Sequence, residues 1–353
     1  MLPTTMRAAR FTGPGQPLVI QDVDVPRAGR GEVVVRVRAT GLCGSDVHIA
    51  IEGVTPTGFL PITLGHEPAG EVAEVGDGVS GWAPGDRVTV FPVQSCGWCE
   101  HCIVGRPQVC ASRRLVGIHL DGGLAEYLLT PASALIALPE LVSFEVGAII
   151  VDAVATPFHA LRDRAQLRAG ETVAVFGVGG LGVHAIELAR FMGAGLLIAV
   201  DVRPSQLERA KQFGADLTID AASADPVAAV LEATAGRGVD VAAEFVGQQA
   251  TITQAVQALA TAGRAVIVGL GPEPLTGPPP TVFVRKEASI LASYASTRHT
   301  AELLVSLVAT GRLDFARSVT HRFPLEQANE ALQVLLTKDG DPLRVVIQPD
   351  KAS

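Results

Sequence analysis

The sequence has few charged residues, no basic run and no long apolar stretch, and each shortage excludes a class of protein. Charged residues make up 18% and apolar residues 48% of the 353 residues, a composition that excludes a disordered chain. No run of lysine and arginine is present and the formal net charge is −8, so the electrostatic footprint of a nucleic-acid-binding protein is missing. No apolar stretch reaches the roughly 18 residues of a membrane span, and the first residues lack the apolar segment of a signal peptide. These shortages predict a cytoplasmic protein with no nucleic-acid or membrane partner.

The length suggests two domains, and the sequence pattern changes near residue 150. Before that point, short Val-rich runs alternate with Gly and Pro turns, which indicates a compact, partly barrel-like β-unit. After it, apolar strand candidates alternate with helical stretches, which predicts βαβ units and a parallel sheet. We expect helices over 153–167, 183–191 and 300–310, strands over 171–176, 196–200, 239–244, 265–268 and 344–347, and a loop over 272–280.

Four of the five cysteines lie within fifteen residues, with the spacing Cys96-x2-Cys99-x2-Cys102-x7-Cys110. Four thiolates this close can surround Zn²⁺ tetrahedrally, with Zn–S distances of about 2.3 Å. Such a site has no open position, so the spacing predicts a structural zinc. An iron–sulfur cluster is the main alternative, because closely spaced cysteines also hold clusters.

A glycine-rich motif follows the strand expected over 171–176 and opens the next helix; it consists of Gly177, Val178, Gly179, Gly180, Leu181 and Gly182. In this context a G-x-G-x-x-G pattern predicts a dinucleotide site with the pyrophosphate at the helix N-terminus. Asp201 ends the next strand, where a carboxylate accepts hydrogen bonds from the ribose 2′-hydroxyl and repels a 2′-phosphate. NAD is therefore favoured over NADP, although the nearby Arg203 could meet a phosphate.

The stretch from Gly41 to His48 reads as a turn at the end of an expected strand. It presents a thiol, a hydroxyl, a carboxylate and an imidazole on a rigid support. Cys43 in this stretch and His66 in Gly65-His66-Glu67 are candidate members of a second metal site. A His–Glu pair on a turn is common, so a buried histidine without a metal is the alternative.

These motifs, in this order, resemble those of the zinc-dependent medium-chain alcohol dehydrogenases over nearly the full length. The resemblance implies an α/β fold with a Rossmann dinucleotide-binding domain, a doubly wound parallel sheet, over residues 153–292. It implies a β-rich GroES-like catalytic domain over residues 1–152 and 293–353. Two zinc ions per chain, NAD, a small alcohol or carbonyl substrate and a homodimer or homotetramer are also implied.

The same resemblance implies roles for individual residues. Cys43 and His66 are expected to bind the catalytic zinc, and Asp152 stands where the family has its third ligand, often a cysteine. Asp152 could instead be the N-cap of the helix that follows it. Glu67 matches a family carboxylate that can approach the zinc, and Asp46 is expected to hold His66.

For alcohol oxidation, the resemblance implies that Ser45 takes the proton of the alcohol, which then leaves through the cofactor ribose and His48. The residues expected around the nicotinamide are Thr156, Val268, Gly269 and Leu270. Arg344 matches a family arginine near the pyrophosphate, with an ordinary surface arginine as the alternative.

The leading interpretation is an NAD-dependent dehydrogenase of primary or secondary alcohols. Polyol or threonine oxidation stays open, because carboxylate-ligated zinc occurs in those branches of the family. Reduction of activated C=C bonds is less favoured, because Ser45 and His48 are both present. A nucleotide-binding protein without turnover is disfavoured, because Cys43 and His66 are both retained.

Overall fold

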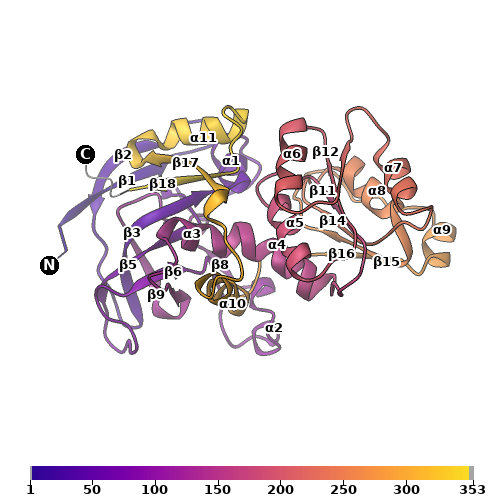
Figure 1. The fold of residues 1–353 in the computed structure, drawn as a ribbon. Coiled ribbons are helices and arrows are strands. Elements are labelled where there is room, and N and C mark those ends of the chain that lie inside the picture. The colour runs from indigo at the N-terminus through magenta and orange to yellow at the C-terminus, as the bar shows by residue number, and fades with distance from the viewer. Residues whose placement is uncertain (1, 350–353) are drawn as a thin grey trace. The chain divides into compact units, whose positions relative to one another are not determined.

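The computed structural model describes residues 2–349, which form two compact units (Figure 1). The first unit runs to Ala155 and resumes at Ser296, and the second unit comprises Thr156–Ala295. Each boundary lies three residues after the boundary expected from the sequence. The β-rich first unit and the α/β second unit confirm the predicted fold class.

Short strands make up most of the first unit: β1 (Thr5–Phe11), β2 (Val19–Asp24), β3 (Glu32–Leu42), β4 (Ile62–Thr63), β5 (Glu67–Val75), β6 (Arg87–Val90), β7 (Val93–Gln94), β8 (Arg114–Leu115), β9 (Tyr127–Pro131), β10 (Leu135–Ala137), β17 (Val319–Pro324) and β18 (Arg344–Gln348). The largest sheet has the order β10-β6-β5-β3-β18-β17, with β9 also paired to β3. Smaller sheets have the orders β2-β1-β4 and β7-β8.

Strand β3 lies inside the largest sheet. Val33, Val35 and Val37 alternate along the strand and are fully buried in one apolar cluster, and β-branched residues favour a strand that packs in this way. β18 pairs antiparallel with the end of β3, with Val345 opposite Leu42. A strand near the C-terminus therefore flanks the segment that leads into the candidate metal site.

The first unit also contains α1 (Gly44–Ala50), α2 (Glu100–Ile103), α3 (Phe144–Ile149), α10 (Arg298–Ala309) and α11 (Ala328–Thr337). Helix α11 was not predicted; it packs on β17 and β18 and against α1 (Figure 1). Helix α10 begins two residues earlier than the helix expected over 300–310.

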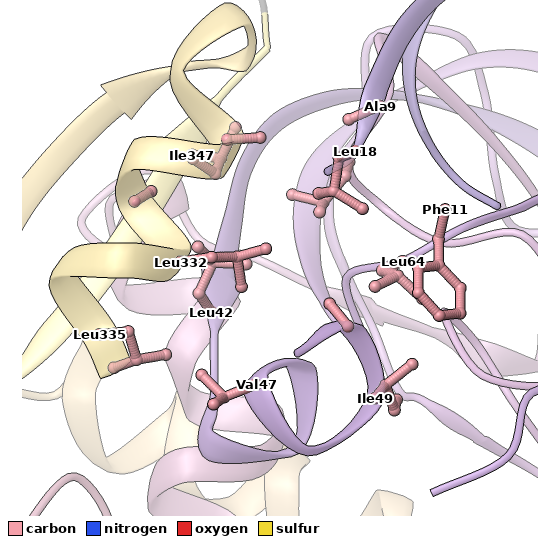
Figure 2. Packing of buried hydrophobic residues seen from close by; sticks show 14 of the residues in the cluster. Ala9, Phe11, Leu18, Leu42, Val47, Ile49, Leu64, Leu332, Leu335 and Ile347 are labelled. Atoms are coloured by element: carbon pink, nitrogen blue, oxygen red, sulfur yellow. The ribbon is translucent and has the colours of Figure 1, made fainter. Parts of the chain in front are cut away.

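Helix α1 corrects the turn expected over Gly41 to His48. The Asp46 carboxylate accepts a hydrogen bond of 2.9 Å from the Cys43 backbone N–H, which stabilises the start of the helix. Figure 2 shows Val47 and Ile49 of α1 in one apolar cluster with Leu332 and Leu335 of α11. A seven-residue helix is not stable alone, so this packing holds α1 in place.

A continuous helical segment from Phe144 to Arg164 combines α3, a π-helical turn, α4 and a second π-helical turn. The bounds after α3 are Ile150–Val154, Ala155–His159 and Ala160–Arg164. By length and composition this 21-residue segment is apolar enough to cross a membrane, contrary to the expectation from the sequence. Because 83% of the most apolar stretch is buried inside the protein, it is a core helix.

The helix begins nine residues before the start expected at residue 153. Ser143 is its N-cap, with Oγ accepting a hydrogen bond of 3.2 Å from the Val146 backbone N–H. The alternative role of Asp152 as an N-cap is therefore wrong. Asp152 lies in the first π-helical turn, and such turns re-aim side chains within a helix.

The second unit is built on a six-stranded parallel sheet of β11 (Val173–Phe176), β12 (Leu197–Asp201), β13 (Leu217–Asp220), β14 (Val239–Glu244), β15 (Leu259–Ile267) and β16 (Ser289–Ala292). The order β13-β12-β11-β14-β15-β16 is the doubly wound arrangement of a Rossmann fold. The strand expected over 265–268 is the end of the longer β15.

Helices cover both faces of this sheet: α5 (Gly182–Phe191), α6 (Pro204–Gln212), α7 (Pro226–Ala233), α8 (Gln249–Gln257) and α9 (Pro280–Arg285). In Figure 1, α5 and α6 lie on one face and α7 and α8 on the other. This layering buries both faces of the parallel strands.

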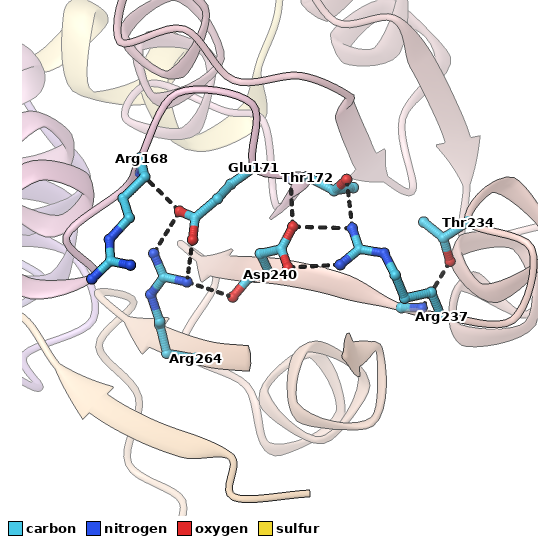
Figure 3. A network of polar contacts seen from close by, with 8 residues as sticks. Arg168, Glu171, Thr172, Thr234, Arg237, Asp240 and Arg264 are labelled. Carbon is cyan, nitrogen blue, oxygen red and sulfur yellow. Dashed lines mark hydrogen bonds and ion pairs between the residues drawn. The ribbon is translucent and has the colours of Figure 1, made fainter. Parts of the chain in front are cut away.

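A polar network links β14 and β15 to the residues that directly precede β11 (Figure 3). Arg264 of β15 donates two hydrogen bonds, of 2.9 and 2.6 Å, to the carboxylate of Glu171, which precedes β11. Asp240 of β14 accepts from the Thr172 backbone N–H and pairs with Arg237. The network therefore lies before the start of β11, whereas the glycine motif follows the other end of the same strand.

Candidate active site and metal centres

The four predicted cysteines lie together in the first unit. Their sulfur atoms are all within 4.8 Å of one another, and Sγ–Sγ distances include 3.9 Å for Cys96–Cys102, 3.5 Å for Cys99–Cys102 and 3.6 Å for Cys96–Cys110. A tetrahedron with Zn–S bonds of about 2.3 Å has edges of about 3.8 Å. The spacing of the free thiols therefore fits one zinc ion and no disulfide.

The backbone of this segment favours the thiolate form that binds metal. A hydrogen bond from the Trp98 backbone N–H, with further hydrogen bonds from the Cys99 backbone and the neighbouring thiols, lowers the pKa of Cys96 to about 6. The backbone N–H of Cys102 also lowers the pKa of Cys99, but burial and the neighbouring thiols raise it to about 11. The Cys99 backbone N–H also donates to the Cys96 sulfur, at 3.3 Å. Helix α2 follows directly and carries Cys102, so one short loop and helix set the geometry.

A second group combines different ligand types. The sulfur of Cys43, a ring nitrogen of His66 and carboxylate oxygens of Glu67 and Asp152 all lie within 4.8 Å of one another. Cys43 follows the end of β3, the histidine precedes β5, Glu67 begins β5 and Asp152 comes from the π-helical turn. Sulfur, nitrogen and oxygen donors in a compact group suit Zn²⁺ in a catalytic site.

Two buried atoms of this group have no hydrogen-bond partner within residues 2–349: Nδ1 of His66 and Oδ1 of Asp46. They lie 3.7 Å apart, so the hydrogen bond expected between these residues is not formed in this structure. Burial lowers the pKa of His66, but the charge of Asp46 and the close polar groups of Asp152 and Cys43 outweigh burial and raise it well above its usual value. A cluster that favours positive charge at its centre fits a bound cation.

Glu67 and Arg344 form a buried ion pair beside these ligands. The guanidinium lies 2.6 Å from both carboxylate oxygens, and the side chains are 2% and 0% exposed. Burial raises the pKa of Glu67 to about 7 even though the guanidinium opposes it. Burial also lowers the pKa of Arg344, but the charges of Glu67, Cys43 and Asp152 and the hydrogen bond to Glu67 together raise it above its usual value. The alternative of a surface arginine is therefore wrong. The contact of Arg344 with the pyrophosphate stays a prediction, and in this structure its guanidinium is paired with Glu67.

The predicted proton-transfer residues lie on α1. Ser45 Oγ is 3.9 Å from the Cys43 sulfur, which places the hydroxyl beside the mixed-ligand group. His48 is 38% exposed, and its Nδ1 is 2.6 Å from Oε2 of Glu52. The acid at position 52 was missed from the sequence, although a spacing of four residues on a helix indicates such a contact.

The glycine loop has the shape that a dinucleotide requires. Gly177 has a φ of +82°, and a Cβ on Gly182 would lie 1.8 Å from the Gly177 carbonyl oxygen. A Cβ on Gly179 would meet nothing within 4 Å, so the backbone there is open to a ligand. Gly180 and Leu181 complete the turn into α5, whose N-terminal N–H groups suit a pyrophosphate.

Asp201 ends β12, as predicted, and faces this loop. Its carboxylate accepts hydrogen bonds from the backbone N–H groups of Val178, at 2.9 Å, and Arg203, at 3.0 Å. The negative charge is therefore fixed beside the glycine loop, the position that suits a ribose with free hydroxyls.

The residues predicted around the nicotinamide lie in the second unit. Thr156 is buried in α4, while Val268, Gly269 and Leu270 follow β15. The backbone N–H groups of Val268 and Gly269 donate to the carbonyl oxygen of Glu244, at 2.9 and 3.2 Å. Glu244 was missed; its buried side chain also accepts from the N–H groups of Val246 and Gly247 and so holds the neighbouring loop.

A Rossmann unit with a nucleotide loop, joined in one chain to a β-unit with two candidate zinc sites, defines a nucleotide- and zinc-dependent oxidoreductase. Two family models match: the alcohol dehydrogenase GroES-like domain over residues 29–140 and the zinc-binding dehydrogenase domain over residues 180–310. The chain belongs to the zinc-dependent medium-chain alcohol dehydrogenase family.

The similarity to individual relatives extends over nearly the whole chain. An NAD-dependent alcohol dehydrogenase of Sulfurisphaera tokodaii is 36% identical over 94% of this chain and 96% of that protein. A sorbitol dehydrogenase of Bacillus subtilis is 32% identical over 99% of both. The structure of an alcohol dehydrogenase from Thermus sp. ATN1 matches with a TM-score of 0.91 and 33% identity, over 97% of this chain and 99% of that one.

Proposed function

We propose that the protein is an NAD-dependent alcohol dehydrogenase that interconverts a small primary or secondary alcohol and its aldehyde or ketone. The observation that carries the proposal is the group of Cys43, His66, Glu67 and Asp152, in a chain that also has a dinucleotide loop followed by Asp201. Alcohol dehydrogenases among its relatives support the same activity.

Each of the two side-chain groups would hold one zinc ion, with Cys43, His66 and Asp152 as ligands in the mixed group. A zinc ion bound there supplies a Lewis acid for the substrate oxygen. The chain holds Glu67 back from these ligands by its ion pair with Arg344. A site with three protein ligands keeps a position for the substrate.

The proton of the alcohol is handled by residues of α1. Ser45 Oγ, beside the Cys43 sulfur, accepts it, and His48 at the exposed side of the same helix passes it to solvent. Thr156 and the backbone of Val268, Gly269 and Leu270 hold the nicotinamide, and Asp201 selects NAD.

A substrate panel tests this function directly. NADH formation is measured with primary, secondary and polyhydric alcohols and with threonine, and NADH oxidation is measured with ketones, aldehydes and activated enals. We expect the highest kcat/KM for a simple alcohol with NAD, and a lower value with NADP. Turnover of enals alone contradicts the proposal.

Polyol oxidation is the second candidate. Sorbitol dehydrogenases are among the similar proteins, from Bacillus subtilis, chicken and rat, at 32–35% identity. The carboxylate of Asp152 among the metal ligands agrees with that branch. Higher kcat/KM for sorbitol than for every simple alcohol in the panel identifies this candidate as correct.

We also propose that the enzyme is a cytoplasmic homodimer or homotetramer. All five cysteines are free thiols, which suits a reducing compartment. Strand β16 is an outer strand of the second sheet, and Leu275, Val282 and Val284 are exposed in the same unit. Light scattering after size exclusion tests this: a mass of 36.6 kDa, that of one chain, contradicts it.

A further inference from the structure

The imidazole of His48 has a partner that the function proposed above does not use. Its Nδ1 lies 2.6 Å from Oε2 of Glu52, four residues along the chain. Within residues 2–349 the ring makes no other hydrogen bond, so Nε2 has no partner in that part of the chain. The contact therefore distinguishes the two ring nitrogens.

We propose that Glu52 is a positioning residue for proton release: it accepts the Nδ1 proton of His48 and leaves Nε2 as the atom that takes up the proton. The proposal rests on alcohol oxidation as the function. A neutral imidazole carries one proton, and the ring nitrogen that faces a carboxylate carries it. The other nitrogen then has a free lone pair, as a proton acceptor requires.

The backbone geometry supports this arrangement. Ser45, His48 and Glu52 are spaced by three and four residues, which puts them on one face of a helical turn. The backbone N–H groups of Ile51 and Glu52 both donate to the Val47 carbonyl oxygen, at 2.9 and 3.1 Å, so Glu52 lies in the turn that ends α1. The other face is packed in the apolar cluster, as Val47 and Ile49 in Figure 2 show.

An ordinary surface ion pair is the competing explanation. The side chains of His48 and Glu52 are 38% and 42% exposed, and exposed pairs four residues apart add little to stability. A surface pair of that kind has no influence on a proton-transfer rate. The two explanations therefore differ in kinetics rather than in stability.

The proton balance of the step is simple. The alcohol loses a hydride to the oxidised nicotinamide and a proton from its oxygen. That proton forms a new N–H bond at Nε2 of His48 as an O–H bond on the donor side breaks. The resulting imidazolium lies against the negative charge of Glu52, and it returns to the neutral form by losing one proton to water or buffer.

The kinetic test compares four variants of the zinc-loaded enzyme: Glu52→Leu, Glu52→Gln, His48→Gln and the double variant Glu52→Leu/His48→Gln. We expect Glu52→Leu to slow pre-steady-state NADH formation about tenfold, with the KM for NAD within about twofold of the wild type. Glu52→Gln keeps an acceptor oxygen and loses about threefold. Glu140→Gln removes an exposed carboxylate of the same unit and serves as the control.

The double variant decides whether Glu52 acts through His48. We expect it to be no slower than His48→Gln alone, because the carboxylate then has no ring to orient. An equal loss from Glu52→Leu in both backgrounds overturns the proposal, since it indicates a structural effect. A Glu52→Leu rate equal to that of the wild type also overturns it.

A second measurement does not depend on turnover. With ¹⁵N-labelled histidine in the zinc-loaded protein, the His48 signals are assigned by their loss in His48→Gln. We expect Nδ1 protonated in the wild type and a mixed population of tautomers in Glu52→Leu. Identical His48 nitrogen shifts in these two proteins overturn the role of Glu52. If the His48 nitrogen shifts are as expected but the wild type oxidises no alcohol, the proposed function is overturned and the role of Glu52 in orienting the ring is not.

Discussion

The two candidate zinc groups lie in the same unit but are built in opposite ways. The four thiols come from one segment, residues 96–110, and three of them are partly exposed. The mixed group combines a residue that follows β3, two residues at the start of β5 and one from a core helix, and its cysteine, histidine and glutamate are buried. A local group with four sulfur ligands can be closed by a loop alone. A group with mixed ligands requires the whole fold, and it can keep a position for substrate.

The comparison predicts that loss of one group affects chemistry and loss of the other affects stability. Cys43→Ala has the largest expected effect: turnover falls by about 10³-fold or more, because the metal group loses its only sulfur. The zinc content falls from about two to about one per chain. NADH affinity, measured by fluorescence titration, stays within about twofold of the wild type. Turnover near the wild-type rate refutes the role of Cys43.

Asp152, in the first π-helical turn, tests how much one oxygen ligand contributes to metal affinity in the mixed group. Asp152→Ala is expected to lower zinc affinity about 100-fold, because one oxygen ligand is lost. Asp152→Cys supplies a thiolate at the same position and serves as the matched control, with most of the affinity retained. Competition with a chromogenic chelator measures both. Equal affinities for the wild type and the alanine variant show that Asp152 is not a ligand.

The four-thiol group is expected to affect stability. Cys102→Ser removes one ligand from α2, and the melting temperature is expected to fall by roughly 5–10 °C. The activity per active-site zinc is expected to stay within a few-fold of the wild type. Scanning calorimetry measures the melting temperature, and the rate of NADH formation divided by the zinc content from elemental analysis measures the activity. A complete loss of activity in a folded variant removes the distinction between the two groups.

The ion pair of Glu171 with Arg264 in the second unit gives a stability test that involves neither metal group. Burial raises the pKa of Glu171, but the hydrogen bonds from Arg264, the hydrogen bond from the Arg168 backbone N–H and the charge of Arg264 together lower it below its ordinary value of 4.5. A lowered pKa in the folded state adds stability above the unfolded value, and this stability is lost as the pH falls through the folded value. Glu171→Gln is thus expected to cost about 1 kcal/mol at pH 7, and less below pH 4.5.

Denaturant unfolding between pH 7 and pH 3 measures this difference. Glu208→Gln breaks an exposed ion pair with Lys211 in the same unit and is the control, with a cost near zero. A cost of Glu171→Gln that grows as the pH falls contradicts the assignment.

The features that the sequence predicted correctly are those in which the important residues lie close together along the chain at a characteristic spacing. The four-cysteine segment, the glycine motif and the acid at the end of β12 depend on neighbours along the chain, and each lies where it was expected. The helix α1 was missed, since its stability comes from packing against α11, nearly 280 residues later. The ion pair of Glu67 with Arg344 joins residues 277 apart, and no local pattern indicates it.

The position of β18 has a consequence for how the protein is made. Cys43, His66 and Asp152 leave the ribosome before the second unit does, but the strand beside β3 and its Arg344 follow only afterwards. The group of Cys43, His66, Glu67 and Asp152 is therefore completed last by Arg344, and until that residue is made Glu67 lacks the guanidinium that pairs with it.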